Sequence, residues 1–228
     1  MESSETNALP PIVLAFAATD PSGGAGLQAD VLTLASMGCH PLSVVTAATI
    51  QDTMGVEDVM ALDPEWVADQ ARCVLEDMPV TAIKIGVLGS TENITAIAEV
   101  VSDYPEVPLV LDPVLASGRG DEFTTDEMIT ALRELLIPQT TIITPNSIEA
   151  RRLVQEDGEE DLDLAECARR LLALGCEFVL ITGTHENTTQ VVNTLYSQDG
   201  VVRTDSWERL PGSYHGSGCT LASAIAAT

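Results

Sequence analysis

The sequence predicts an α/β protein with a mainly parallel central sheet that helices cover on both faces. Short apolar runs such as Ile12–Ala17 and Phe178–Thr182 alternate along the chain with stretches of helical spacing. Runs that are apolar at every position are typical of strands buried on both faces, as in a parallel sheet between two helical layers. Near the end of the chain, Asp199-Gly200 separates two strand-like runs, and this dipeptide is typical of a tight antiparallel turn.

The order of the expected elements follows from periodicity and from local start and stop signals. After the strand Ile12–Ala17, a helix is expected over Ala25–Met37, ending at Gly38. The later parallel strands are expected at Leu42–Ala48, Ala82–Leu88, Leu109–Val114, Thr141–Thr144 and Phe178–Thr182. The later helices are expected from Asp63-Pro64-Glu65, over Ile94–Val101, from Thr124-Thr125-Asp126-Glu127 to Leu136, and over Leu162–Leu174.

Two of these helices carry recognisable capping patterns. Asp63 can cap the first turn ahead of Pro64, and Thr124 and Glu127 have capping-box spacing. In the helix that starts at Asp63, the side chains expected on the buried side are Trp66, Ala71, Val74 and Leu75.

The end of the chain departs from the alternating pattern. An antiparallel pair is expected from Val191–Tyr196 and Val201–Thr204, followed by a helix from Gly218 to the last residue. No internal repeat or linker divides the 228 residues, so residues 1–228 are expected to form a single domain.

The charge balance excludes several function classes. The chain has 35 acidic and 10 basic residues, a formal net charge of −25, and Lys84 is its single lysine. Without a basic stripe, nucleic acid and anionic membrane surfaces are not expected partners. The acidic residues are spread along the chain, which is typical of a halophile-like, solvated surface in a salt-rich cytoplasm.

The cysteines and the beginning of the chain indicate a reducing compartment. The five cysteines are odd in number and lack CxxC spacing, so neither a disulfide framework nor a zinc site is expected. The first residues are polar and acidic rather than signal-like, and no apolar run approaches the ~18 residues of a membrane span. We therefore expect a soluble cytoplasmic protein.

Two glycine-containing turns precede helices and are candidates for anion binding. The first is Thr19–Gly26 (TDPSGGAG), and the second is His215–Thr220 (HGSGCT). Small residues at a helix start expose backbone N–H groups toward a ligand. Cys219 lies in the first turn of its helix, where the thiol pKa is expected to be lowered, making it a candidate base. The alternative is that Cys219 is simply a buried cysteine.

Polar residues at predicted strand ends form a third group. Asn146 and Glu149 follow the strand Thr141–Thr144, and they can cap a helix or lie beside phosphate-bound Mg²⁺. Asp112 follows another strand and is a second carboxylate candidate. Gln51 offers both a donor and an acceptor, which suits an aminopyrimidine edge, and the alternative is an amide on the protein surface.

In their order and wording, these motifs resemble the hydroxymethylpyrimidine/phosphomethylpyrimidine kinases of thiamine biosynthesis, members of the ribokinase superfamily. The segments that carry the resemblance run from about Ile12 to the end of the chain: ATDPSGGAGLQAD (18–30), VVTAATIQDTMGV (44–56), AIKIGVLGS (82–90), VLDPVLASG (110–118), LIPQTTIITPNSIEA (136–150), LITGTH (180–185) and HGSGCTLASAIAA (215–227).

The resemblance implies a three-layer α/β/α ribokinase-like fold and a kinase that uses ATP and Mg²⁺. The implied substrates are 4-amino-5-hydroxymethyl-2-methylpyrimidine and its monophosphate, which becomes the diphosphate. By position, Cys219 would be the catalytic base, and Gly216, Ser217 and Gly218 would form an anion hole. The pyrimidine site would comprise Gln51, Asp30, Ala18, Val87 and Val114. The ATP and phosphate site would comprise Asn146, Glu149, Thr182 and Gly183, with Asp112 and Glu149 near the metal of Mg-ATP.

Some positions differ from the family pattern, and two other functions stay open. Ala18 and Thr182 stand where relatives often carry glycine and lysine, and relatives usually continue with further C-terminal helices. Relatives are often dimers, so the resemblance implies that this chain forms a homodimer. The alternatives are a pyridoxal kinase, because pyridoxal also carries a hydroxymethyl group on a ring, and a non-catalytic pyrimidine-binding module.

The acidic composition predicts that salt stabilises the protein. The midpoint of thermal unfolding should rise from about 0.1 M to molar KCl, because cations screen repulsion among the carboxylates. Circular dichroism against temperature measures this, with sucrose at matched osmolality as the control. A midpoint that salt leaves unchanged would contradict the prediction.

Overall fold

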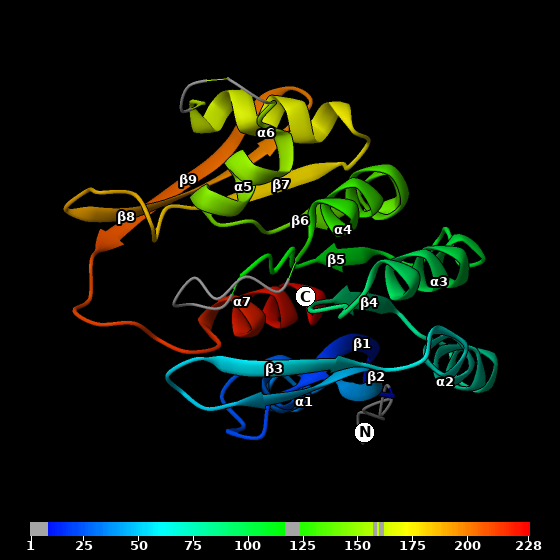
Figure 1. Ribbon diagram of the computed structural model, residues 1–228. Helices are drawn as coiled ribbons and strands as arrows, with labels where there is room; N and C mark the ends of the chain where they lie inside the picture. The colour runs from blue at the N-terminus through cyan, green and yellow to red at the C-terminus, as the bar shows by residue number, and fades with distance from the viewer. Residues whose placement is uncertain (1–8, 117–123, 157–158, 160–161) are drawn as a thin grey trace, which may run out of the picture.

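A nine-stranded sheet forms the centre of the molecule in the described part of the chain (Figure 1). The computed structural model describes residues 9–116, 124–156, 159 and 162–228. The strand order is β3-β2-β1-β4-β5-β6-β7-β8-β9. The strands are β1 (Ile12–Thr19), β2 (His40–Gln51), β3 (Val56–Ala61), β4 (Ala82–Ile85), β5 (Leu109–Leu111), β6 (Ile142–Ile143), β7 (Phe178–Thr182), β8 (Gln190–Ser197) and β9 (Gly200–Glu208).

The predicted fold class is confirmed by the strand pairing. Strands β2, β1, β4, β5, β6 and β7 are parallel neighbours, whereas β8 and β9 continue the sheet as an antiparallel pair. The expected turn at Asp199-Gly200 joins β8 to β9, where Gly200 has a φ of +108°.

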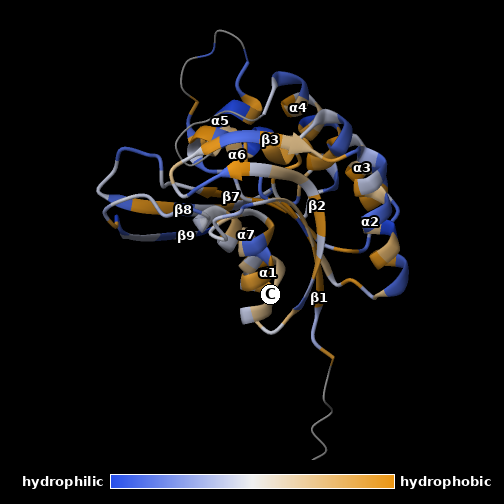
Figure 2. Ribbon diagram, turned by 60° about the horizontal axis from the view of Figure 1, so that its bottom comes forward, coloured by the Kyte–Doolittle hydropathy of each residue, from blue (hydrophilic) through white to orange (hydrophobic). Residues whose placement is uncertain are grey.

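Helices cover both faces of the sheet, and this produces three layers. The helices are α1 (Gly26–Ser36), α2 (Pro64–Asp77), α3 (Thr91–Ser102), α4 (Asp126–Ala131), α5 (Ser147–Val154), α6 (Leu164–Ala173) and α7 (Ser217–Ala226). Figure 2 shows α1 and α7 on one side of the strands and α2 and α3 on the other. The first and last helices of the chain therefore share one face.

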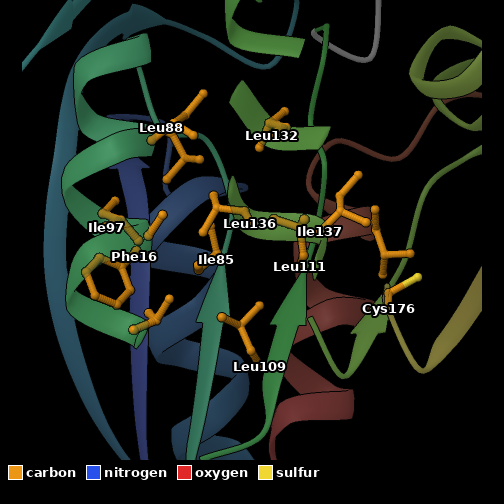
Figure 3. Close-up of a cluster of buried hydrophobic side chains, with 14 of the residues drawn as sticks. Phe16, Ile85, Leu88, Ile97, Leu109, Leu111, Leu132, Leu136, Ile137 and Cys176 are labelled. Atoms are coloured by element: carbon orange, nitrogen blue, oxygen red, sulfur yellow. The ribbon is translucent and has the colours of Figure 1, made fainter. Parts of the chain in front are cut away.

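Each face has its own buried apolar layer. In the larger layer, apolar side chains of the helices from α2 through α6 pack against the sheet. Figure 3 shows Phe16, Ile85 and Leu111 of the strands pointing toward Ile97 and Leu136. The smaller layer, under α1 and α7, is built around alanine and valine side chains such as Ala15, Ala17 and Val110. Small side chains on this face let the two helices approach the strands closely.

The expected helices form, with two local corrections. Thr125, and not Thr124, caps α4, because its side chain accepts a hydrogen bond from the N–H of Met128. The expected continuous helix to Leu136 changes after Ala131 into a π-helical turn over Leu132–Leu136 and a 3₁₀ turn over Ile137–Gln139. Pro138 lies in that last turn and cannot donate the backbone bond that would extend an α-helix.

Two further expectations differ from the structure. Trp66 is 71% exposed, so it is not on the buried side of α2 with Ala71 and Leu75. The sequence interpretation also missed β3, which pairs antiparallel with β2. Its alternating pattern is weak because its exposed side carries Glu57 and Met60.

The helix starts fall into two groups. Asp63, Ser90, Thr125, Asn146 and Asp163 each cap a helix by accepting a backbone N–H bond through their side chains. Helices α1 and α7 begin at Ala25 and Gly216, which provide no side-chain cap. Among the helices described, α1 and α7 therefore present first-turn N–H groups that a ligand can accept from.

Among the described residues, no helix is both long enough and apolar enough to cross a membrane.

Candidate active site

A cavity of about 410 Å³ opens where the parallel strands end. The residues around it follow the carboxyl ends of β1, β2, β4, β5, β6 and β7, which is where α/β sheets bind ligands. Twelve of the fourteen predicted site residues line it: Ala18, Gln51, Val87, Asp112, Val114, Asn146, Glu149, Thr182, Gly216, Ser217, Gly218 and Cys219. Residues far apart in the sequence therefore meet at one site.

The two glycine turns are held together by Asp20 and His215. Nε2 of His215 lies 2.8 Å from Oδ2 of Asp20. The Asp20 carboxylate also accepts the N–H groups of Ser22 and Ala25 at 2.8 and 2.7 Å. One buried carboxylate thus organises the turn before α1 and anchors it to the turn before α7.

Glycine is required where these turns touch. Gly216 has a φ of +78°, and a Cβ there would overlap the carbonyl oxygen of Gly24. A Cβ on Gly24 would lie 2.8 Å from Cδ2 of His215. The absence of side chains at Gly24 and Gly216 therefore brings the uncapped starts of α1 and α7 to the same wall of the cavity.

A hairpin that the sequence interpretation missed forms another wall. Gln51 ends β2, and the turn residues Thr53, Met54 and Gly55 line the cavity together with Val59 of β3. Oδ1 of Asp52 accepts the N–H groups of Met54 and Gly55 at 2.7 and 3.1 Å, which closes the turn. An Asp followed three residues later by Gly was the available signal in the sequence.

Cys219 occupies the expected place, but its predicted electrostatics were wrong. Burial raises the pKa of its thiol to about 12, and the Lys84 ammonium only partly opposes this. The helix start does not lower the thiol pKa because the side chain is withdrawn from water, being 9% exposed. Burial raises the pKa of the Asp112 carboxyl to about 6, although the Lys84 ammonium and the nearby Cys219 thiol act to lower it.

Asp30 is not part of the cavity wall, so that prediction was wrong. Its carboxylate is fully buried and accepts two bonds from Nζ of Lys84, at 2.8 and 2.9 Å, and one from Oγ of Ser223, at 2.7 Å. Lys84 is also fully buried, and sequence reasoning gave it no role. An Asp in the apolar pattern of α1 and a lysine inside an apolar strand were the signals for a buried pair.

Asn146 and Glu149 form the capping box that their spacing predicted. Oδ1 of Asn146 accepts the N–H of Glu149 at 3.0 Å, and Oε2 of Glu149 accepts the N–H of Asn146 at 2.9 Å. Burial, reinforced by the Asp112 carboxylate, raises the pKa of Glu149 to about 8. Both residues still line the cavity, so the structural and functional interpretations are compatible.

The far side of the cavity is formed by the segment after β7. Thr182, Thr184 and His185 line it, whereas Gly183 does not, since its Cα lies against the backbone of Val192 in β8. The guanidinium of Arg209 donates to the carbonyl oxygens of Gly183, Thr184, Glu186 and Thr188. This arginine, which the sequence analysis did not select, fixes the shape of the segment.

The donor set agrees with a magnesium ion that arrives with a nucleotide. Oδ2 of Asp112 is buried and has no hydrogen-bond partner within the described residues. The same part of the chain gathers no three His, Cys, Asp or Glu side chains able to hold a metal unaided. One free carboxylate oxygen suits Mg²⁺, which keeps waters and takes its other ligands from phosphate.

Comparison with known proteins agrees with this geometry. A sequence profile of the phosphomethylpyrimidine kinase family matches residues 20–228. The chain belongs to this family. The hydroxymethylpyrimidine/phosphomethylpyrimidine kinase of Escherichia coli is 38% identical over 215 residues, which cover 94% of this chain and 81% of the relative.

Two solved structures place the fold among vitamin kinases. The phosphomethylpyrimidine kinase of Clostridium difficile has a TM-score of 0.80 and 35% identity, covering 95% of this chain and 89% of that one. The pyridoxal kinase of Staphylococcus aureus in complex with AMP-PCP and pyridoxal has a TM-score of 0.81 and 28% identity, covering 96% and 79%. The chain is therefore a kinase with a ribokinase-like fold.

The Asp20 carboxylate gives a stability prediction with a definite sign. Burial acts to raise the pKa of Asp20, but the donors on Ser22, His215 and Ala25 outweigh it and lower the pKa below the ordinary 3.8. The ionised form therefore stabilises the folded state above that value, and the stabilisation is lost as the pH falls through the folded pKa.

The substitution Asp20→Asn should cost about 2 kcal/mol at neutral pH, since charge-assisted bonds are removed. The cost should shrink when urea unfolding is repeated at a pH below 3.8, as wild-type Asp20 begins to gain its proton. Asp52→Asn changes an aspartate in an exposed turn and serves as the matched control. An equal cost of Asp20→Asn at both pH values would refute the assignment.

Proposed function

We propose that this chain transfers the terminal phosphoryl group of ATP to 4-amino-5-hydroxymethyl-2-methylpyrimidine and then to the resulting monophosphate. The observation that carries the proposal is the meeting of two uncapped helix starts, Gln51 and Cys219 around one cavity. The names of the Escherichia coli and Clostridium difficile relatives support the same substrates.

The pyrimidine would lie between Gln51 and the apolar wall. The Gln51 amide can donate to a ring nitrogen and accept from the exocyclic amine. Ala18, Val87 and Val114 offer apolar surface to the two faces of the ring. A flat heterocycle with one polar edge matches this combination.

The phosphate groups would lie at the two helix starts. The N–H groups of Gly216 and Gly218 would form the anion hole for the transferring group, and that of Ser217 would join them by leaving the carbonyl oxygen of Tyr214, to which it donates at 3.2 Å. Asn146, Glu149 and Thr182, with Gly183 behind them, would border the nucleotide. Mg²⁺, carried by the ATP phosphates and lying near Asp112 and Glu149, would supply charge neutralisation between the phosphates.

The proton of the substrate alcohol would leave through Cys219. Because its thiol is protonated at rest, Sγ can accept the alcohol proton only as it gives its own proton to Asp112. The Asp112 carboxylate is suited to this, since its pKa of about 6 leaves it largely ionised at neutral pH. The number of protons is conserved along this alcohol–thiol–carboxylate path.

The cellular compartment and the oligomeric state of the enzyme are also proposed. Each of the five cysteines is free, which agrees with a reducing cytoplasm. The net charge of −25 agrees with a halophile-like, solvated surface in a salt-rich interior. A homodimer is proposed from the resemblance to relatives alone.

Pyridoxal is the second candidate substrate. It also presents a hydroxymethyl group on a flat ring, and the Staphylococcus aureus relative was solved with it. Gln51 favours the aminopyrimidine because its amide matches the amine next to the ring nitrogen.

Product analysis by mass spectrometry tests the proposed function. With ATP and MgCl₂, the pyrimidine alcohol should give the monophosphate first and the diphosphate later. The kcat/KM for the pyrimidine alcohol should exceed the kcat/KM for pyridoxal. Omission of ATP is the control. A larger kcat/KM for pyridoxal would favour the second candidate, and tight pyrimidine binding without turnover would favour a non-catalytic module.

The substitution Cys219→Ala should separate the two phosphoryl transfers. The first transfer should lose about 100-fold in kcat/KM, because an alcohol needs a base in the transition state. The second should lose much less, because a phosphate monoester is already largely ionised at neutral pH. Cys73→Ala, on the exposed face of α2, is the matched control. Equal losses in a folded variant would argue against the base.

A further inference from the structure

The single lysine of the chain lies beneath the proposed reaction centre. The other nine basic residues are arginines, and Lys84 is fully buried in the middle of β4. A compact ammonium is therefore used at one position only, inside the protein. Gly86 leaves room for it, since a Cβ at Gly86 would lie 2.7 Å from Nζ of Lys84.

Strand register places Lys84 on the face that α7 covers. Lys84 pairs with Ala15 on β1 and with Val110 on β5, and both neighbours belong to the apolar layer under α1 and α7. Asp112 is two residues beyond Val110, so its side chain leaves the chain toward the same face. The N–H of Asp112 donates to the carbonyl oxygen of Ile85 at 2.8 Å.

Helix α7 brings the other two members of the cluster. Cys219 and Ser223 are one helical turn apart and lie on the same side of α7. Ser223 donates to Asp30, which holds Nζ of Lys84, while Cys219 and Asp112 both line the cavity. The lysine and the two groups that would handle the substrate proton therefore lie on the same face of the sheet, beneath α7.

The charge balance shows what the ammonium does there. Asp30 and Asp112 are 0% and 5% exposed, and Nζ of Lys84 donates to Asp30, so Asp112 is a second carboxylate withdrawn from water on this face. Lys84 interacts electrostatically with Asp112 and with Cys219 as well as with Asp30. Lys84 does not line the cavity, so it acts on the reaction through these neighbours and not on the substrate.

We propose that Lys84, clamped by Asp30, is a positioning residue that holds Asp112 and the Cys219 turn in their reactive arrangement beneath the anion hole. This inference rests on the proposed function and adds a residue to it. A buried ion pair is weak evidence for a stabilising role, because apolar replacements of similar volume are often neutral for stability. Its place between α1, α7 and the carboxyl end of β5 points instead to catalysis.

A double-mutant cycle distinguishes a positioning role of Lys84 in catalysis from an effect on folding stability alone. Lys84→Met alone leaves the Asp30 carboxylate buried without its partner and should lower the unfolding midpoint strongly. Lys84→Met combined with Asp30→Asn removes both charges and should regain most of that stability. The kcat of the double variant should stay about 100-fold below wild type, as when one preorganised electrostatic group is lost. The KM for the alcohol should change little.

Two further variants keep the test decisive. Asp30→Asn alone retains the ammonium and should keep more kcat than the double variant. Ser223→Ala removes one bond to Asp30 without changing the charge of the cluster and should lower kcat, though by less than the double variant does. Ser102→Ala, at the exposed end of α3, is the matched control that should leave kcat unchanged. If the methionine variants do not fold, Lys84→Gln with Asp30→Asn supplies a neutral pair that can still hydrogen-bond.

The result that would overturn the inference is recovery of kcat together with stability in the double variant. A rise of the KM for the alcohol equal to the loss in kcat/KM would also overturn it, since that pattern indicates a distorted binding pocket. The kcat ratios are taken with whichever alcohol the wild-type protein phosphorylates, so the choice between pyrimidine and pyridoxal is settled separately.

Discussion

The packing of α1 beside α7 on one face of the sheet is the constraint on which the site depends. These helices come from opposite ends of the chain, and their first turns carry the two glycine segments. Because neither helix has a side-chain cap, its exposed N–H groups can serve a ligand. The Asp20 carboxylate fixes the two turns relative to each other through Ala25 and His215.

This arrangement explains how a strongly acidic protein can manage phosphate chemistry. A net charge of −25 offers little attraction for a nucleotide, and none of the described residues that line the cavity is a lysine or an arginine. The positive character of the cavity would then come from helix starts and from a metal that accompanies the nucleotide. The one lysine is kept inside, where water and salt cannot screen its charge.

Most of the fold was predictable from the sequence because its strands are short apolar runs separated by helical periodicity. The strand Phe178–Thr182 and the turn at Asp199-Gly200 form as predicted. Strand β3 was missed because one of its faces is exposed and carries mixed residues. The break after Ala131 was missed because local hydrophobic spacing hardly distinguishes a π-helical turn from an α-helix.

Polar residues at strand ends and in glycine turns allowed most of the site to be predicted from the sequence. The degree to which each side chain is buried could not be predicted in the same way. Twelve predicted residues meet in the cavity, because strand carboxyl ends share one edge of the sheet. The pKa of the Cys219 thiol was predicted in the wrong direction, because a helix start lowers it only when solvent or a close cation supports the thiolate. Asp30 was misplaced because its partner, Lys84, is 54 positions away in sequence.

The contact between Gly24 and Gly216 has a consequence for how such enzymes diverge and can be recombined. A methyl group on Gly216 would overlap the backbone of Gly24, and one on Gly24 would meet the ring of His215, so any insertion or shift in one turn must be matched in its counterpart. A chimaera of two homologues that exchanges only the last forty or so residues would join turns shaped for different neighbours. Successful recombination should inherit both ends of the polypeptide from the same parent and confine its crossovers to the middle.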